Sequence, residues 1–281
     1  MPRKRLVWKL KSREIQLGDR TLIVAILNVT PDSFSDGGQY SDPDRAFARA
    51  LELEEQGADI IDIGAESTRP GSARISEAEE KRRLMPILKR LRDKLAVPIS
   101  VDTYKSAVAE NALELGAEII NDPSGLTFDT QLARVATNHD AGLILNHMRG
   151  TPETWAKLPP MKDAVGGVRA DLAACVHRAV AAKLDRARIV IDPGIGFGKR
   201  GEQNTEILAH LPALTALDLP ILVAPSRKQF LKQATEKETQ FATAAAVTAA
   251  ILGGAHLVRV HDVAEMKAVV NVADAIARHL S

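Results

Sequence analysis

Short runs of aliphatic residues alternate along the chain with segments in which apolar residues recur at helical spacing. Eight such runs, each with a polar or charged residue at or near its end, are TLIVAIL (21–27), DIIDIG (59–64), PISVD (98–102), EIIND (118–122), GLILNH (142–147), RIVIDPG (188–194), PILVAPS (220–226) and HLVRVH (256–261). Between the first two, the apolar residues of 43–56 fall on one helical face, and Gly57 ends the predicted helix.

This alternation predicts an α/β fold, because continuous apolar strands between amphipathic helices form a parallel sheet that the helices cover. Eight units in about 250 residues is the size of a single (β/α)8 TIM barrel, with the active site at the C-terminal ends of the strands. A doubly wound open sheet is the alternative, although no linker divides the chain. The longest irregular stretch, 151–170, lies inside one strand–helix unit.

The composition fits one large core: 281 residues, 45% hydrophobic and 26% charged, exclude a disordered chain and a coiled coil. Lys plus Arg number 37 against 36 Asp plus Glu, so no global positive field favours nucleic acid as a main partner. Residues 1–20 are locally basic and lack the apolar segment of a secretory signal. We expect 1–20 to form an extension or a short strand or hairpin, and 21–281 to form the barrel domain.

No stretch approaches the roughly 20 apolar residues that cross a bilayer, so no membrane association is expected. Cys175 is the only cysteine, which excludes an internal disulfide and fits a reducing, cytoplasmic compartment. It lies among apolar residues on a helical face, so core packing is the better interpretation than chemistry.

Polar residues at the strand ends are the candidates for function, because barrel enzymes place their chemistry there. They are Asn28, Asp62 with Glu66, Asp102, Asn121 with Asp122, Asn146 with His147, Asp192, Ser226 with Arg227 and Lys228, and Arg259 with His261. A single strand-end Asp or Asn is more often a helix cap or turn former. Eight such positions at one rim are harder to explain by capping alone.

The candidates also separate by charge. Carboxylates and amides come from the third, fourth and sixth runs (Asp102, Asn121, Asp192), which suits a flat heterocycle with N–H donors and ring acceptors. Cations come from the last two runs (Lys228, Arg259, His261), where barrels frequently hold phosphate. The predicted ligand is a polar heterocycle joined to an anionic group. The alternative for Arg259 and His261 is an ordinary surface pair.

The glycine-rich segment DPGIGFGKR (192–200) does not match a nucleotide motif, because Arg200 follows Lys199 and the third glycine of the dinucleotide pattern is missing. Its glycines are interpreted as allowing backbone to approach a flat ligand, with Phe197 lying against that ligand. His147 and His261 lack spaced partners for a zinc site.

Seven segments resemble the dihydropteroate synthase family. They are NVTPDSFSDGG (28–38), GADIIDIGAESTRPG (57–71), SVDTYK (100–105), GAEIINDPSG (116–125), IVIDPGIGFGK (189–199), SRK (226–228) and VRVHDV (258–263). The resemblance runs from about residue 20 to the C-terminus. It implies a transferase of folate biosynthesis that joins a dihydropterin methyl diphosphate to p-aminobenzoate, releasing pyrophosphate. It also implies a cytoplasmic homodimer of the kind that sulfonamides target.

The resemblance further implies residue roles. Asn28 would bind Mg²⁺ on the diphosphate. The pterin would be held by Asp102, Asn121, Asp192 and Lys228, and the diphosphate by Thr68, Arg259 and His261. The second substrate would be enclosed by Phe34, Asp36, Arg69, Pro70, Phe197 and Lys228, with Ser226 contributing to substrate binding. Catalysis would rest on Asp102, Asp192, Lys228, Arg259 and His261.

The sequence departs from the family pattern in three places. Asn146 stands where Met is more common and needs a partner for its amide, Ala224 and Pro225 precede the SRK motif, and Gln229 follows it. Two alternatives remain: a methyltransferase domain that uses methyltetrahydrofolate, and a non-catalytic pterin-binding paralogue. The methyltransferase would need no residues for a diphosphate, and the paralogue would be expected to lose loop residues first.

Overall fold

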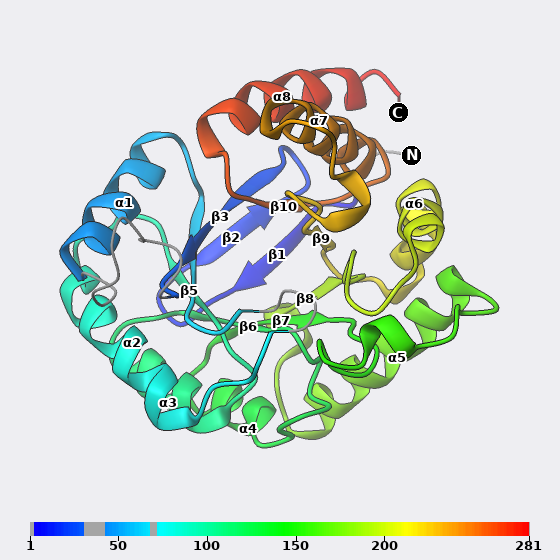
Figure 1. Cartoon of the computed structure of the whole chain (residues 1–281). Coiled ribbons are helices and arrows are strands. Elements are labelled where there is room, and N and C mark those ends of the chain that lie inside the picture. Colours follow the sequence, from blue (N-terminus) through cyan, green and yellow to red (C-terminus); the bar gives the residue numbers. More distant parts are fainter. Residues whose placement is uncertain (1–2, 31–42, 68–71, 281) are drawn as a thin grey trace.

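Eight parallel strands form the centre of the computed structural model, which describes residues 3–30, 43–67 and 72–280 (Figure 1). The strands are β3 (Leu22–Asn28), β4 (Ile60–Gly64), β5 (Ile99–Asp102), β6 (Ile119–Asp122), β7 (Gly142–Asn146), β8 (Ile189–Asp192), β9 (Leu222–Val223) and β10 (Leu257–Val260). They pair in the order β8-β7-β6-β5-β4-β3-β10-β9. A parallel bridge between Ile191 and Ile221 brings the two edge strands together. The predicted (β/α)8 barrel is therefore confirmed, and each strand lies in a predicted run, except that β3 continues one residue further, to Asn28.

Helices surround this sheet as an outer ring (Figure 1). They are α1 (Pro43–Glu55), α2 (Glu77–Leu91), α3 (Ser106–Glu114), α4 (Leu132–Asn138), α5 (Ala164–Ala181), α6 (Gly201–Ala209), α7 (Glu236–Leu252) and α8 (Val263–Ala277), with 3-10 turns η2 (Trp155–Lys157), η3 (Arg186–Arg188), η4 (Leu211–Leu217) and η5 (Gln229–Leu231). The helix predicted over 43–56 is α1, and Gly57 follows it with a φ of 96°. Its Ala46, Ala50 and Leu53 are buried in the layer between helices and strands.

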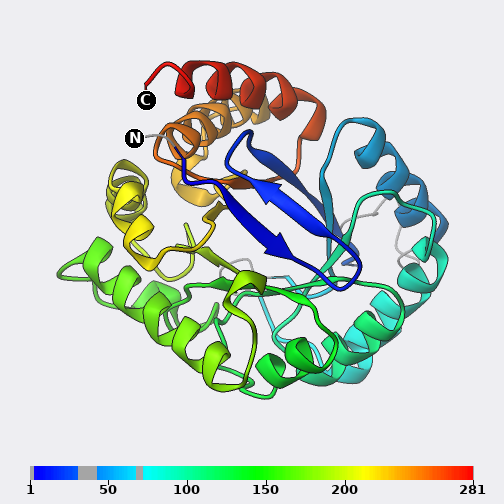
Figure 2. The same ribbon diagram turned by 180° about the vertical axis from the view of Figure 1, so that it is seen from behind.

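A second, smaller core fills the barrel interior. It contains Leu22, Val24, Ile60, Ile119, Ile144, Val190, Leu222 and Leu257 from the strands. An antiparallel hairpin of β1 (Leu6–Lys9) and β2 (Glu14–Leu17) adds Trp8 and Leu17 to this core. The Trp8 indole N–H donates to the carbonyl oxygen of Arg188 at 2.9 Å. Seen from behind, the hairpin lies across this end of the barrel (Figure 2).

The irregular stretch after β7 is shorter than the predicted 151–170, because α5 already begins at Ala164. Asp163 is its N-cap and accepts a hydrogen bond from the Gly166 backbone N–H at 2.7 Å. First-turn N–H groups have no partner inside a helix, so an aspartate cap stabilises a start that contains two glycines. Cys175 on this helix is buried, as predicted. In the described ranges, no helix combines the length and apolarity of a membrane span.

Candidate active site

The sheet register places the predicted strand-end residues in one row. Asn28 is opposite Gly64, Gly64 is opposite Asp102, and Asp102 is opposite Asn121. Asn146 is opposite Asp192 on the other side of the barrel. A cavity of about 1270 Å³ opens at this end, and the side chains around it include Asn28, Asp102, Lys228, Arg259 and His261. The fold thus brings residues from four strands or strand ends (β3, β5, β9 and β10) to one cavity.

Arg259 is the centre of an ionic cluster inside the barrel mouth. Its Nε donates to Asp62 Oδ2 at 2.6 Å, and its Nη2 donates to Asp102 Oδ2 at 2.8 Å. Asp62 Oδ2 also accepts from the Asn121 amide at 2.9 Å. Two of the five guanidinium N–H donors are therefore engaged by carboxylates. Arg259 does not stand as a free cation, although its remaining donors are not bound by described residues.

Asp62 is the member of this cluster to which sequence reasoning gave no role. Its side chain is fully buried, and its Oδ1 has no hydrogen-bond partner among the described residues. The signal was an aspartate at an inward position in the middle of an otherwise aliphatic strand. Burying a carboxylate there is costly unless a cation and a donor accompany it, and Arg259 and Asn121 supply both.

The two predicted pterin carboxylates are both poor acids in this setting. Burial raises the pKa of Asp102 to about 7, opposed by the positive charge of Arg259. Burial raises the pKa of Asp192 to about 6, opposed by the Gly194 backbone N–H, which donates to its Oδ1 at 2.7 Å. Asp102 lines the cavity, and buried carboxylates with raised pKa values beside a cavity are typical of a functional site.

His261 differs from the prediction that it is a cation. Burial, together with the neighbouring Arg259, lowers the pKa of its imidazole to about 3, so the ring is neutral at pH 7. Its Nδ1 lies 2.9 Å from Ser226 Oγ, and its backbone N–H donates to the same oxygen at 3.2 Å. If the Ser226 hydroxyl donates to Nδ1, the ring presents an Nε2–H, which is a hydrogen-bond donor without charge.

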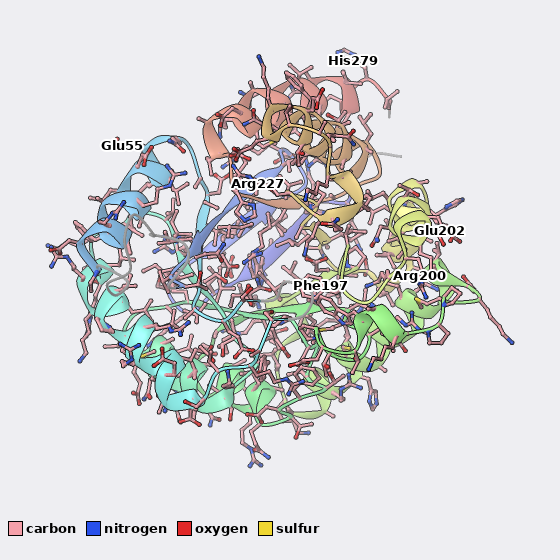
Figure 3. The ribbon with its side chains drawn as sticks, in the orientation of Figure 1. Glu55, Phe197, Arg200, Glu202, Arg227 and His279 are labelled. Carbon is pink, nitrogen blue, oxygen red and sulfur yellow. The ribbon has the colours of Figure 1, made fainter. Side chains whose placement is uncertain are left out.

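Lys228 and Phe197 lie together on one side of the mouth. The Lys228 ammonium is 4.0 Å from the centre of the Phe197 ring, and Trp155 packs edge-on against that ring at 5.3 Å. Burial lowers the pKa of Lys228 to about 8, with a further contribution from Arg259. In Figure 3, Phe197 and Arg227 lie inside the ring of helices, whereas Glu55 lies on its outer side.

Gly194 and Gly198 are required by packing inside the protein, whereas the approach of this segment's backbone to a ligand stays a prediction. Gly194 and Gly198 have φ values of 65° and 70°. A Cβ on Gly194 would lie 1.8 Å from the carbonyl oxygen of His147, and one on Gly198 would lie 2.6 Å from that of Arg149. The close contact is with the loop after β7, so these glycines are required by packing between two loops of the protein.

Other strand-end candidates have local structural roles. Asp122 accepts from the backbone N–H groups of Ser124 at 2.8 Å and Leu126 at 2.5 Å, which makes it a turn former. Asn146, the first departure from the family pattern, donates to the carbonyl oxygen of Pro123 at 2.8 Å. His147 Nε2 lies 3.0 Å from an Asp171 carboxylate oxygen.

Glu66 lies at the cavity wall beyond β4 and was named in the sequence without a role. It accepts from the Tyr104 hydroxyl at 3.0 Å and from the Lys105 ammonium at 2.6 Å. Lys105 also pairs with the buried Glu80, so this wall is fixed by an ionic network. Phe34 and Asp36 (in 31–42), and Thr68, Arg69 and Pro70 (in 68–71), lie outside the described residues.

Comparison with known proteins decides the family. A model described as "Pterin binding enzyme" matches residues 24–261. A dihydropteroate synthase of Synechocystis is 45% identical over 265 residues, which cover 93% of this chain and 92% of the relative. The chain belongs to the dihydropteroate synthase family of pterin-binding enzymes.

Solved structures of the family have the same fold. The Yersinia pestis dihydropteroate synthase in a sulfonamide drug complex is 35% identical, with a TM-score of 0.91 over 97% of this chain and 100% of that one. The Xanthomonas albilineans enzyme in complex with 7,8-dihydropteroate is 36% identical, with a TM-score of 0.85 over 95% of this chain and 98% of that one. These matches confirm the predicted family.

Proposed function

We propose that the protein condenses a 7,8-dihydropterin methyl diphosphate with p-aminobenzoate to give 7,8-dihydropteroate and pyrophosphate. The observation that carries the proposal is the barrel mouth itself. Asp102 on β5 lines one cavity together with Lys228, Arg259 and His261. Behind it, Asn121 on β6 is bonded to Asp62 of the Arg259 cluster, and Asp192 on β8 interacts electrostatically with Lys228 and Arg259. The relatives named dihydropteroate synthase align over nearly the whole chain.

The barrel strands would hold the pterin. Asp102 and Asp192 offer carboxylate oxygens to the ring N–H groups of the heterocycle. Asn121 already donates its N–H to Asp62, so its carbonyl oxygen is oriented to accept. Because β5 and β6 are paired on both sides, and β8 is paired with β7 and bridged to Ile221, the geometry of these three side chains is set before substrate arrives.

The reaction breaks the bond between the pterin methylene carbon and the diphosphate oxygen, and the electron pair leaves with the diphosphate. The methylene becomes cation-like and shares its charge with the pterin ring, which the buried Asp192 carboxylate favours. The arylamine nitrogen then attacks the methylene and loses a proton, which passes to water or to the released pyrophosphate. Since this amine is uncharged at neutral pH, no strong protein base is required. Lys228, Arg259 and the Nε2–H of His261 would donate to the leaving group.

Mg²⁺ is proposed as the metal, with Asn28 as its protein ligand. Within the described ranges, no cluster of three or more His, Cys, Asp or Glu could form a metal cage. Mg²⁺ usually keeps several waters and binds through one or two protein oxygens plus substrate phosphates, so a single amide at the end of β3 fits an ion that arrives with the diphosphate. When bound, it would neutralise charge on the leaving group.

The second substrate would lie beside Lys228 and Phe197, with Ser226 behind His261. The roles of Phe34, Asp36, Thr68, Arg69 and Pro70 stay predictions. A cytoplasmic location also stays a prediction, supported by the single, buried Cys175.

The decisive assay supplies purified protein with the pterin diphosphate, labelled p-aminobenzoate and Mg²⁺. We expect labelled dihydropteroate and one pyrophosphate per product, and loss of turnover when EDTA removes the metal. A methyltransferase would instead bind methyltetrahydrofolate and leave the diphosphate intact, and a non-catalytic paralogue would bind pterin without turnover. Either result contradicts the proposal.

The pKa shifts predict a narrow pH optimum. Raised carboxylate pKa values of about 7 for Asp102 and about 6 for Asp192 mean that activity is lost as pH falls through this range. The lowered pKa of about 8 for Lys228 means that activity is lost as pH rises through it. We expect a plot of kcat/KM for the pterin diphosphate against pH to be bell-shaped, with its maximum between the pKa of Asp102, about 7, and that of Lys228, about 8. In Lys228→Arg, the fall in kcat/KM at alkaline pH should be much smaller, because arginine stays charged. An unchanged fall at alkaline pH would mean that another group causes it.

We also propose a homodimer formed through α7 and α8, which pack side by side (Figure 1). Phe241 on α7 and Val272 on α8 are each 62% exposed, and Ile276 and Leu280 are also exposed. An exposed apolar surface of this kind is typical of an interface. Phe241→Glu with Val272→Glu should convert a dimer to a monomer in light scattering. Val180→Glu, at an exposed apolar position on α5, should leave the mass unchanged.

A further inference from the structure

Lys199, at the end of the glycine-rich segment, has an ammonium that is surrounded by backbone carbonyl groups. Its Nζ donates to the carbonyl oxygens of Gly194 at 2.6 Å, His147 at 3.2 Å and Phe197 at 3.3 Å. The side chain is partly buried and lines the cavity. Among the described residues it forms no ion pair with a carboxylate. Burial lowers the pKa of Lys199 well below the ordinary value of a lysine. The three carbonyl oxygens oppose this shift, because they match the three N–H donors of a protonated lysine, whereas a neutral amine has only two.

One of these bonds joins two loops that the barrel leaves apart: Lys199 follows β8, whereas His147 follows β7. The other two bonds, to Gly194 and Phe197, fold the loop after β8 around the same ammonium. A second link between the loops is the Arg149 guanidinium, which donates to the Gly198 carbonyl oxygen at 3.1 Å. The segment 194–198 has little regular support of its own: Gly194, Gly196 and Gly198 all have positive φ. Apart from Lys199, its supports include the Phe197 N–H bond to the Gly194 carbonyl and the Gly196 N–H bond to Asn204 Oδ1. A glycine-rich segment has many backbone conformations available, so a fixed cation has a large effect on its position.

The position of this segment determines the position of Lys228. Phe197 lies under the Lys228 ammonium, and the Lys228 side chain also approaches Gly196, where a Cβ would lie 2.9 Å from its Cδ. Asp102 and Asn121 are held instead by the strands, and Asp192 is held both by its strand and by the Gly194 N–H at 2.7 Å. Phe197 and the Lys228 side chain have no such strand support, so a change in the segment would affect the Lys228 side of the cavity more than the pterin side.

We infer that Lys199 is a positioning residue for the second substrate: its ammonium fixes the loop after β8 to the loop after β7, and so fixes Phe197 and Lys228 where the arylamine binds. The inference rests on the proposed function for the identity of that substrate. The clamp between the two loops is a separate, structural statement and can be tested without turnover.

The structural test uses Trp155, which packs on Phe197. The chain has two tryptophans, so Trp8→Phe leaves Trp155 as the single emitter. In that background, Lys199→Met should shift the emission maximum and increase quenching by acrylamide, while far-UV circular dichroism stays unchanged. Lys232→Met removes a lysine from the same cavity wall without removing a carbonyl contact, and should leave the emission unchanged. Unaltered emission in Lys199→Met would overturn the clamp, whatever the enzyme assay shows.

The kinetic test separates the two substrates. Lys199→Met should raise KM for p-aminobenzoate at least about tenfold, equivalent to about 1.4 kcal/mol, and change the Kd of a pterin lacking the diphosphate by less than about threefold. Equal losses for both ligands would overturn the assignment to the second substrate.

Chemical rescue tests the ammonium itself. Lys199→Cys treated with 2-bromoethylamine forms a C–S bond with loss of bromide and regenerates an ammonium at nearly the original length. The native Cys175 is buried and its pKa is raised to about 11, so treated wild-type protein is the matched control. We expect treatment to restore the arylamine KM and the Trp155 emission. Confirmed modification without recovery of either would show that the ammonium is not the positioning group.

Discussion

Arg259→Met is expected to lower the free energy of unfolding by about 3–5 kcal/mol and to abolish turnover. The loss of stability comes from the two carboxylates, Asp62 and Asp102, that no longer have a positively charged partner. Asp62 is fully buried and Asp102 is 16% exposed at its side chain, and both accept hydrogen bonds from one guanidinium. Without it, two acidic groups face each other in the barrel mouth, and the pterin-binding position of Asp102 is no longer fixed.

Urea unfolding monitored by circular dichroism measures the effect on stability. Arg20→Met is the matched control. Like Arg259, Arg20 makes two hydrogen bonds to carboxylate oxygens, in this case both on Asp59, but its side chain is 53% exposed. An exposed pair contributes about 1 kcal/mol or less, so the control should keep its stability and its activity. Adding Asp62→Asn to Arg259→Met should recover part of the lost stability without recovering turnover. Equal destabilisation by the Arg20 and Arg259 variants would contradict the role of the buried cluster.

Asp192→Asn is expected to reduce kcat by about 10²–10³-fold and, at the same time, to stabilise the protein. The carboxylate is 4% exposed and its pKa is raised from 3.8 to about 6 by burial. Because the folded-state pKa is raised, the folded protein loses stability relative to the unfolded chain as pH rises from 3.8 to 6. A neutral amide avoids this loss, and its oxygen can still accept from Gly194. We expect a gain on the order of 2 kcal/mol at pH 7.5.

Asp122→Asn is the matched comparison. Burial also raises the pKa of Asp122 to about 6, but both of its carboxylate oxygens accept hydrogen bonds, one from Ser124 and one from Leu126. An amide would place N–H₂ against one of these N–H donors. This variant should therefore lose stability in thermal unfolding and keep its kcat. If both variants changed kcat equally, Asp192 would have no special part in stabilising the methylene cation.

Local sequence was sufficient to predict the barrel and the positions of its strand ends. Strand and helix periodicity depend on neighbouring residues, and eight apolar runs with polar ends could form few other folds. Asp102, Asn121 and Asp192 could be named because parallel strands bring their carboxyl ends to one rim whatever the side-chain contacts are. The motifs also predicted the family, because the identity of their residues and their order along the chain can be read directly from the sequence.

The partners of these residues were decided only by the tertiary structure. Arg259 meets Asp62 and Asp102 from 197 and 157 residues away, and this contact depends on register and inward orientation in a closed sheet. Burial, which no local pattern reports, makes His261 neutral. The glycines of 194–198 were recognised as special, but the reason, contact with the His147 and Arg149 carbonyls, belongs to a different loop. Sequence thus determined which groups reach the mouth, whereas long-range packing determined their charges and contacts, because both depend on residues that are distant along the chain.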